Sequence, residues 1–498
     1  MKRSLAAVAL CTGALALAAC SDDDPIRSGS IGSADEATMP SASAEPTEPA
    51  EPPTDDGPTG DLDVALSEPR EDSLYPDVSD PGVDALHYDL ALGWSPDTDT
   101  LEATETMTFR STETDDSFQL DFSEVLEIDL LTVDGADVEF EQRGKDLVIQ
   151  APVREDQRYE VVIDYSGTPE PVDVPTQRSD FGETGFTITD DHEVWTMQEP
   201  WGAYSWYAVN DHPSDKALYD FTLSVPAPWM GIANGDLVST EESDGQTVTR
   251  WHLAEPAASY LTTLAFGDYE QTELTGPRDI PIRLFTPRDE PDAVQGPSTA
   301  PEAMEWLEQY VGPYPFDTFG IVVVDSSSGM ETQTMVTLGN SDYTLSLPVV
   351  VHELAHQWYG DTVTPDDWRD VWMNEGMAMY LQGMWEAERA GIPVDEQMDQ
   401  WAEFEDGERE FAGPPADYDL DKWGSGNIYY GPALMWHELR QQIGDEKFFE
   451  VIRAWPESQE NRSANRETLY QFFEKQTGEE LSEFFDAWLL GEATPPRD

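Results

Sequence analysis

Two histidines four positions apart, His352 and His356, enclose a glutamate in the stretch VVVHELAHQWYGD at residues 349–361. On a helix, residues four apart lie on the same face, so both imidazoles can bind one metal ion. Glu353 follows the first histidine, where its carboxylate can reach a water molecule on the metal without itself being a ligand. The alternative interpretation is an ordinary helix whose two histidines are hydrogen-bonded to carboxylates.

A carboxylate that can complete a metal site follows on the next helical pattern. Eighteen residues separate His356 from Glu375, which lies near the start of WRDVWMNEGMAMYLQGMWEAERAGIP, a helix expected to end before Gly391. Two histidines and one glutamate leave the fourth tetrahedral position of zinc to water, as a catalytic zinc site requires. We therefore predict one zinc ion held by His352, His356 and Glu375.

The elements that must position these residues change character along the chain. From about Asp84 to Tyr269, short alternating segments such as TETMTFRST and RYEVVIDYSG are separated by turn-rich pieces, which predicts an antiparallel all-β domain. Beyond Pro277, a helical segment (PEAMEWLEQYV), a buried strand (GIVVVD) and long helical segments follow. Pro348 suits the first turn of the helix that carries the histidines, and Gly360 is expected at its end.

The first residues have the pattern of an export signal. A basic start is followed by small apolar residues that end in LAAC, which predicts a lipoprotein signal peptide over residues 1–19 and lipidation of Cys20. The alternative is an ordinary cleaved signal in which this cysteine is incidental. Residues 20–74, rich in Pro, Ser, Asp and Glu, are expected to form a flexible tether. Since Cys11 is the only other cysteine, the mature chain can form no internal disulfide.

The charge of the chain is strongly negative. Acidic residues number 102 against 26 basic ones, for a formal net charge of −76. Such a surface repels nucleic acid and anionic lipid headgroups, which makes both poor partners. Its self-repulsion also weakens the compact state unless salt screens it, so we expect a protein adapted to salty surroundings.

Several motifs together resemble one family. HELAHQW, the 18-residue spacing, WMNEGMA and SGMETQT resemble the aminopeptidase N family of zinc metallopeptidases, which are gluzincins with a thermolysin-like catalytic domain. Other segments, including IYYGPALMWHELRQQIGDEKFF, extend the likeness to nearly everything after about Tyr75. The resemblance implies an α+β multidomain fold. An antiparallel β-sandwich or saddle domain over residues 75–272 would precede a thermolysin-like, mostly helical zinc-peptidase domain over residues 273–498.

The resemblance also implies substrate-binding residues. Gly329, Met330 and Glu331 fall where the family has its exopeptidase motif, so Glu331 would bind the free α-amino group of the substrate. Ser328 and Thr332 replace the glycine and the asparagine that usually flank this motif. Glu199, in MQEPWG, falls where the family supplies a second anchor from the β domain. The alternative for Glu199 is a solvated acid on a loop.

A tyrosine is expected to stabilise the oxyanion of the tetrahedral intermediate. Aligning the family pattern without gaps back from residues 439–440 places Tyr429 in this role, with the adjacent Tyr430 as the alternative. Either tyrosine could instead be an aromatic residue of the core. Glu353 would act as the general base and return its proton to the leaving amine.

Three classes of function compete. The leading prediction is a zinc aminopeptidase that acts on peptides with a free N-terminus; the others are a zinc endopeptidase and a surface lipoprotein that binds peptides without turnover. We expect a monomer, anchored by lipid on Cys20 to the outer face of the cell membrane.

Overall fold

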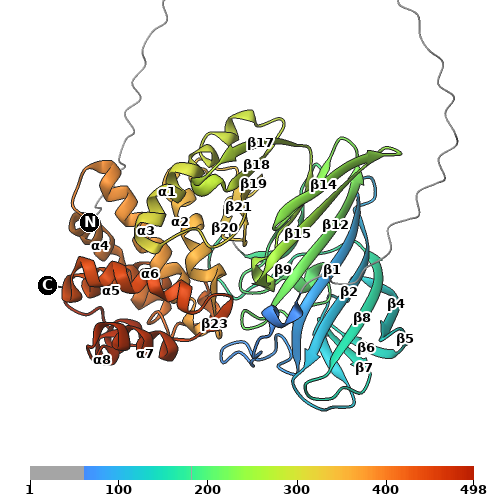
Figure 1. The fold of residues 1–498 in the computed structure, drawn as a ribbon, viewed down its shortest axis with the longest axis horizontal. Coiled ribbons are helices and arrows are strands. Elements are labelled where there is room, and N and C mark those ends of the chain that lie inside the picture. The colour runs from blue at the N-terminus through green and yellow to red at the C-terminus, as the bar shows by residue number, and fades with distance from the viewer. Residues whose placement is uncertain (1–60, 181, 498) are drawn as a thin grey trace, which may run out of the picture. The chain divides into compact units, whose positions relative to one another are not determined.

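The computed structural model describes residues 61–180 and 182–497, and Figure 1 labels its helices and strands. The predicted signal peptide, the lipidated Cys20 and the tether up to residue 60 lie outside the described residues. Within the described ranges, no helix is both long enough and apolar enough to cross a membrane.

The N-terminal domain is built on an eight-stranded sheet, drawn in blue and green in Figure 1. Its strands lie in the order β14 (Asp236–Ser243), β15 (Gln246–Ala258), β12 (Lys216–Pro226), β1 (Val83–Ser95), β2 (Thr100–Ser111), β8 (Arg158–Gly167), β4 (Glu127–Val133) and β5 (Ala136–Asp137). The residues of β2 alternate between buried and more exposed positions, because successive side chains of a strand point to opposite faces of the sheet. The predicted β domain is confirmed, with one departure from an antiparallel sheet, since β1 and β12 pair in parallel.

Smaller sheets cover the inner face of this large sheet. One has the order β13 (Met230–Ala233), β16 (Leu264–Gly267), β11 (Val194–Met197), β10 (Glu183–Ile188) and β9 (Val172–Asp173), and another has the order β3 (Phe118–Asp121), β7 (Asp146–Gln150) and β6 (Glu139–Arg143). Aromatic residues join the layers; the rings of Trp94 on β1 and Phe186 on β10 lie 5.5 Å apart. Both side chains are buried, so the core of the domain lies between its sheets.

The C-terminal domain combines one sheet with eight α-helices among the described residues. The sheet has the order β17 (Tyr269–Thr275), β18 (Pro281–Pro287), β19 (Phe319–Val324), β21 (Met335–Gly339) and β20 (Gly329–Met330), and a short pair joins β22 (Val363–Pro365) to β23 (Arg462–Ala464). The helices are α1 (Ala300–Val311), α2 (Leu347–His356), α3 (Trp372–Ala390), α4 (Val394–Ala412), α5 (Tyr430–Ile443), α6 (Asp445–Ser458), α7 (Arg466–Thr477) and α8 (Ser482–Leu489). Because β17 pairs with β18, the expected boundary between residues 272 and 273 falls within a strand of this sheet.

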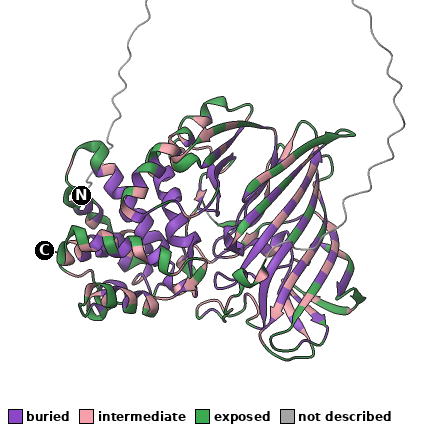
Figure 2. Ribbon diagram, viewed as in Figure 1, coloured by how far each residue is buried: buried purple, intermediate pink, exposed green. Residues whose placement is uncertain are grey.

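Two neighbouring helices, α2 and α3, form the centre of the C-terminal domain, where Figure 2 shows continuous burial. Pro348 lies in the first turn of α2, as predicted. The helix ends earlier than expected, at His356, and an irregular turn over Gln357–Asp361 follows, in which Gly360 has a φ of 135°. Since this φ is unfavourable for any residue with a Cβ, the glycine terminates the helical region.

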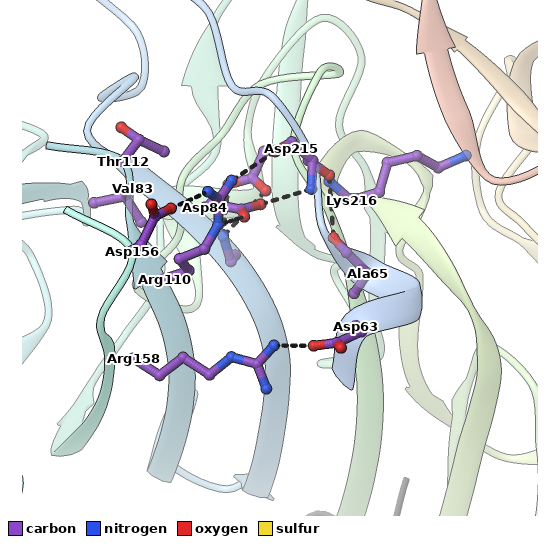
Figure 3. A network of polar contacts seen from close by, with 12 residues as sticks. Asp63, Ala65, Val83, Asp84, Arg110, Thr112, Asp156, Arg158, Asp215 and Lys216 are labelled. Atoms are coloured by element: carbon purple, nitrogen blue, oxygen red, sulfur yellow. Dashed lines mark hydrogen bonds and ion pairs between the residues drawn. The ribbon is translucent and has the colours of Figure 1, made fainter. Parts of the chain in front are cut away.

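Residues 61–74 contact the folded domains, which corrects the predicted extent of the tether. A short 3₁₀ helix, Leu62–Ala65, buries Ala65 against Leu86 and Leu218. Figure 3 shows the polar contacts beside it, where Arg158 pairs with Asp63. The composition of residues 20–74 did not predict these few apolar contacts, because two or three apolar residues hardly change the average hydropathy of a segment.

The two domains also share buried hydrogen bonds. Lys216, at the start of β12, donates from Nζ to the carbonyl oxygen of Asp361 over 2.7 Å. The hydroxyl of Tyr260 donates to the carbonyl oxygen of Gly360 over 3.1 Å. Both acceptors lie in the turn that follows α2, so the β domain directly supports the segment behind the two histidines.

Candidate active site and metal centre

The three residues of the expected metal site meet at the contact between α2 and α3. The Nε2 atoms of His352 and His356 lie 3.2 and 3.5 Å from Oε2 of Glu375. With zinc–ligand bonds of about 2.0–2.2 Å, two ligands on a tetrahedral ion are separated by roughly 3.4 Å. The donor set, two imidazole nitrogens and a carboxylate oxygen, therefore fits a zinc ion in both chemistry and spacing.

The candidate ligands are held in an orientation that suits metal binding. The Nδ1 atom of His356 lies 3.0 Å from the carbonyl oxygen of Tyr359, and a proton on Nδ1 leaves the Nε2 lone pair for a metal. A Cβ on Gly360 would come within 3.3 Å of Nδ1, so the glycine also lets the turn approach the imidazole. Although burial opposes ionisation, His356 and His352 hold the pKa of Glu375 at about 2, which keeps it a charged ligand.

Glu353 lies beside the ligands without joining them. Its carboxylate forms a close group with Glu331 and His356, whose potential ligand atoms all lie within 4.8 Å of one another. Burial raises the pKa of Glu353 to about 8; the charges of Glu331 and Glu375 add to this effect, and His356 opposes it. Such a carboxyl group is suited to accept and return a proton near neutral pH.

Glu199 and Glu331 converge on the same site from different domains. Glu199 follows β11 and Glu331 follows β20, and their carboxylates lie within 4.8 Å of Glu375 and of each other. Both side chains are buried, and each has an oxygen, Oε1, without a hydrogen-bond partner. Burial, then the charges of Glu331 and Glu375, raises the pKa of Glu199 well above its ordinary value. Nδ1 of His356 lies 4.0 Å from Oε1 of Glu331, which is too far for a hydrogen bond.

The strand that carries Gly329 and Met330 lies at an edge of its sheet. Among the described strands, β20 pairs with β21 alone and borders the cavity, so its other side can pair with an extended peptide. Met330 is buried, although it borders the cavity. Thr332, where the family pattern has asparagine, bonds through its hydroxyl to the carbonyl of Met335 and thereby shapes the turn after the strand.

The two candidate tyrosines occupy different environments. The ring of Tyr429 lies 6.1 Å from the ring of His352. Tyr430 instead packs on Phe404, with ring centroids 5.8 Å apart, and contacts Trp401. Tyr429 is thus the tyrosine whose ring neighbours a candidate metal ligand.

The cavity that contains these residues has a volume of about 470 Å³, within the range of small-ligand sites. Besides the predicted residues, it is lined by Arg178, Asp180, Tyr343, Glu408 and Phe411. None of these has a motif or a spacing that relates it to the zinc-binding pattern, so the sequence did not reveal them. The four buried glutamates outnumber the two imidazoles, so all four can ionise together only if positive charge enters the site, as a divalent cation and an ammonium group would supply.

Comparison with known proteins agrees with this arrangement. The family model described as the Peptidase M1 N-terminal domain matches residues 84–261, and the Peptidase family M1 domain matches residues 298–488. Aminopeptidase N of Streptomyces lividans is 24% identical over 332 residues, which cover 61% of this chain and 38% of the relative. Leucine aminopeptidase 2 of Aspergillus niger is 30% identical over 193 residues, which cover 36% and 30%. The matches thus span less than two fifths of these relatives.

Solved structures match over a larger share of their length. The crystal structure of an M1 zinc metallopeptidase from Deinococcus radiodurans has a TM-score of 0.77 and 25% identity, covering 86% of this chain and 98% of the other. A mutant of that metallopeptidase bound to a Tyr-Ser-Ala substrate has a TM-score of 0.78 at 24% identity, with the same coverage. The predicted order of a β domain followed by a helical peptidase domain is therefore confirmed.

Proposed function

Because the chain belongs to peptidase family M1, with both of its domains matched, we propose that it is a zinc-dependent aminopeptidase that removes N-terminal residues from peptides. One observation carries this proposal. Glu199 and Glu331 each present a buried carboxylate oxygen without a hydrogen-bond partner beside the candidate metal ligands. Their geometry suits the α-ammonium group of a peptide, which would lie next to the scissile bond.

The pair Glu199 and Glu331, the proposed ammonium anchor, favours an exopeptidase over an endopeptidase. A positive charge between Glu199 and Glu331 would lower both of their raised pKa values and satisfy both oxygens. Any residue upstream of the bound N-terminus would have to occupy the space between these acids, where an uncharged amide would leave carboxylates buried without a cation. An endopeptidase gains nothing from such a pair.

His352, His356 and Glu375 would hold the zinc ion. When bound, zinc supplies a Lewis acid that polarises a carbonyl oxygen and lowers the pKa of a coordinated water. The edge of β20 would align the peptide backbone, and Glu199 and Glu331 would fix its N-terminus. Glu353 would accept the proton of the attacking water and pass it to the leaving amine, while Tyr429 donates a hydrogen bond to the oxygen of the scissile carbonyl as charge develops there.

The location of the protein is a separate part of the proposal. The basic start, the apolar run and the LAAC sequence before residue 21 support export and lipidation at Cys20. A lipid on this cysteine would hold the domains at the outer face of the membrane. Metabolic labelling with a palmitate analogue tests it, since a Cys20→Ser variant must then lose both the label and the membrane fraction.

The decisive test of activity uses one peptide in two forms, with a free and with an acetylated N-terminus. We expect release of the first residue from the free form only. Glu331→Gln should lower kcat/KM by roughly 10–100-fold, because a hydrogen bond to a charged group contributes about 1.5–3 kcal/mol. Glu302→Gln, which alters an exposed carboxylate on α1, is the matched control and should retain wild-type activity.

Two results would contradict the proposal. Equal cleavage of both peptides would indicate an endopeptidase and would rule out the ammonium anchor. No cleavage of either peptide, by protein with a full complement of zinc, would indicate a binding protein without turnover.

A further inference from the structure

Arg178 belongs to the β domain but lies in the cavity of the peptidase domain. It follows β9, and its side chain is about one third exposed. One nitrogen, Nη1, donates to the hydroxyl oxygen of Tyr429 over 3.3 Å and to the carbonyl oxygen of Gly424 over 3.4 Å. The other two, Nε and Nη2, donate to the carboxylate of Asp180 over 3.4 and 2.8 Å.

These contacts distinguish between two roles for the arginine. A guanidinium group has five N–H donors, and the contacts with Asp180, Gly424 and Tyr429 account for four of them. Asp180 also balances its charge. An arginine engaged in this way is poorly placed to bind a carboxylate of the substrate, but it is well placed to orient the phenol that it contacts.

The loop that carries Arg178 is itself fixed to the segment before Tyr429. The hydroxyl of Thr176 donates to the carbonyl oxygen of Trp423 over 2.7 Å, and the amide of Trp423 donates to the carbonyl oxygen of Pro175 over 2.9 Å. The backbone amide of Arg178 donates to the Thr176 hydroxyl oxygen over 3.1 Å. Reciprocal bonds of this kind hold the arginine and the tyrosine in a constant relation across the domain boundary.

We propose that Arg178 is a positioning residue for Tyr429, an inference that rests on the proposed aminopeptidase function. A phenol has one proton. When its oxygen accepts a hydrogen bond from Arg178, that proton is directed away from the guanidinium and toward the cavity. The nearby positive charge also stabilises the negative charge that the phenol oxygen gains as it donates to the developing oxyanion. The β domain thereby acts on the chemical step, in addition to binding the N-terminus.

A double-mutant cycle tests this role. The variants are Arg178→Ala, Tyr429→Phe and their combination, with Arg178→Lys as a milder change and Arg288→Ala as a control that removes an exposed Arg–Asp pair. For each, kcat and KM are measured on the peptide with a free N-terminus, together with zinc content and melting temperature. Affinity for a phosphinic pseudodipeptide with a free amine, which imitates the tetrahedral oxyanion, is measured by calorimetry.

We expect Tyr429→Phe to lower kcat by about 10²–10³-fold, as the loss of one oxyanion donor does. Arg178→Ala should lower kcat by roughly 10–100-fold, a smaller loss because the donor remains, with KM changed by less than about threefold. In the Tyr429→Phe background the same change should alter kcat by less than about twofold, because the arginine acts through the phenol. Phosphinate affinity should follow the same pattern, and Arg178→Lys should be intermediate.

Additive losses in the two backgrounds would overturn the inference, as would an effect of Arg178→Ala confined to KM. If Arg178→Ala melts well below the wild type, the milder lysine variant decides by the same criteria. A different result contradicts the aminopeptidase proposal, namely that the wild type does not cleave the peptide with a free N-terminus. In that case the calorimetric cycle still shows whether the arginine acts through the tyrosine.

Discussion

Gly329 lies so close to the candidate general base that adding one methyl group tests the geometry of the site. A Cβ at this position would lie 2.6 Å from Oε1 of Glu353 and 3.2 Å from its Cδ. Ordinary van der Waals contact begins near 3.4 Å, so in Gly329→Ala the carboxylate must retreat by about 0.8 Å. The other near atom, Cδ2 of Leu338, is already at 3.4 Å and offers no obstacle.

The displacement has a predictable kinetic cost. A shift of about 1 Å in a positioned catalytic group lowers the rate by roughly 10²-fold, so we expect kcat to fall by about 10–100-fold, which corresponds to about 1.4–2.7 kcal/mol. Since the clash involves the end of a flexible side chain and no metal ligand, zinc content and melting temperature should stay close to those of the wild type. Steady-state kinetics, metal analysis and thermal unfolding measure the three quantities.

Gly407→Ala is the matched control. This glycine lies within α4, and a Cβ there would meet nothing within 4 Å. The change should leave kcat unaltered and raise stability slightly, because alanine favours a helix by up to about 1 kcal/mol over glycine. An unaltered kcat in Gly329→Ala, or a loss of zinc from it, would refute the placement of Glu353 beside this strand.

Three further predictions follow from other parts of the molecule. Glu353→Ala should keep zinc and lose turnover, whereas Glu375→Ala should lose both; a chelator should abolish the activity of the wild type, and added zinc should restore it, as metal analysis and kinetics would show. Glu105 is fully buried, and burial, opposed by a hydrogen bond from the amide of Ala208, raises its pKa to about 8. The folded protein therefore keeps a proton that the unfolded chain releases above about pH 4.5, so this residue lowers the free energy of unfolding by up to about 1.4 kcal/mol per pH unit as pH rises toward 8. Glu105→Gln should remove that slope. If urea unfolding gives the variant and the wild type the same pH dependence of the free energy of unfolding from pH 5 to 8, the prediction is wrong. The net charge of −76 predicts a melting temperature that rises between low and molar salt, which thermal unfolding in sodium chloride measures, and an unchanged value would contradict the expected adaptation to salt.

The parts of the site that could be predicted from the sequence are those that local periodicity defines. A helix places His352 and His356 on one face whatever surrounds it, and the following helical pattern returns Glu375 to them after a short connection. The β domain was predictable for the same reason, because strands such as β2 alternate visibly between buried and exposed positions. In each case, the signal lies within one element or two consecutive ones and does not depend on how domains pack.

The residues that escaped prediction belong to contacts between distant parts of the chain. Arg178 meets Tyr429 across 251 positions, and the sequence around it contains no repeat or spacing that refers to the peptidase domain. Its position depends on how the loop of residues 174–178 packs against the segment before Tyr429. The extent of the tether was predicted wrongly for a related reason, since the ordering of residues 61–74 depends on surfaces that only the folded domain presents.

Through these distant contacts, the β domain contributes side chains to the site that the peptidase domain alone does not contain. A peptidase domain alone would contain His352, His356 and Glu375, but it would lack Glu199 and Arg178. It would also lose the bond from Lys216 to the turn behind α2. The cavity is therefore a composite of both domains: the helices supply the candidate metal ligands, and the β domain supplies one carboxylate of the proposed N-terminal anchor and a cation next to Tyr429. Because hydrogen bonds across the boundary fix the loop of Arg178 and the turn behind α2, a small change in domain packing should disturb substrate binding and the chemical step together.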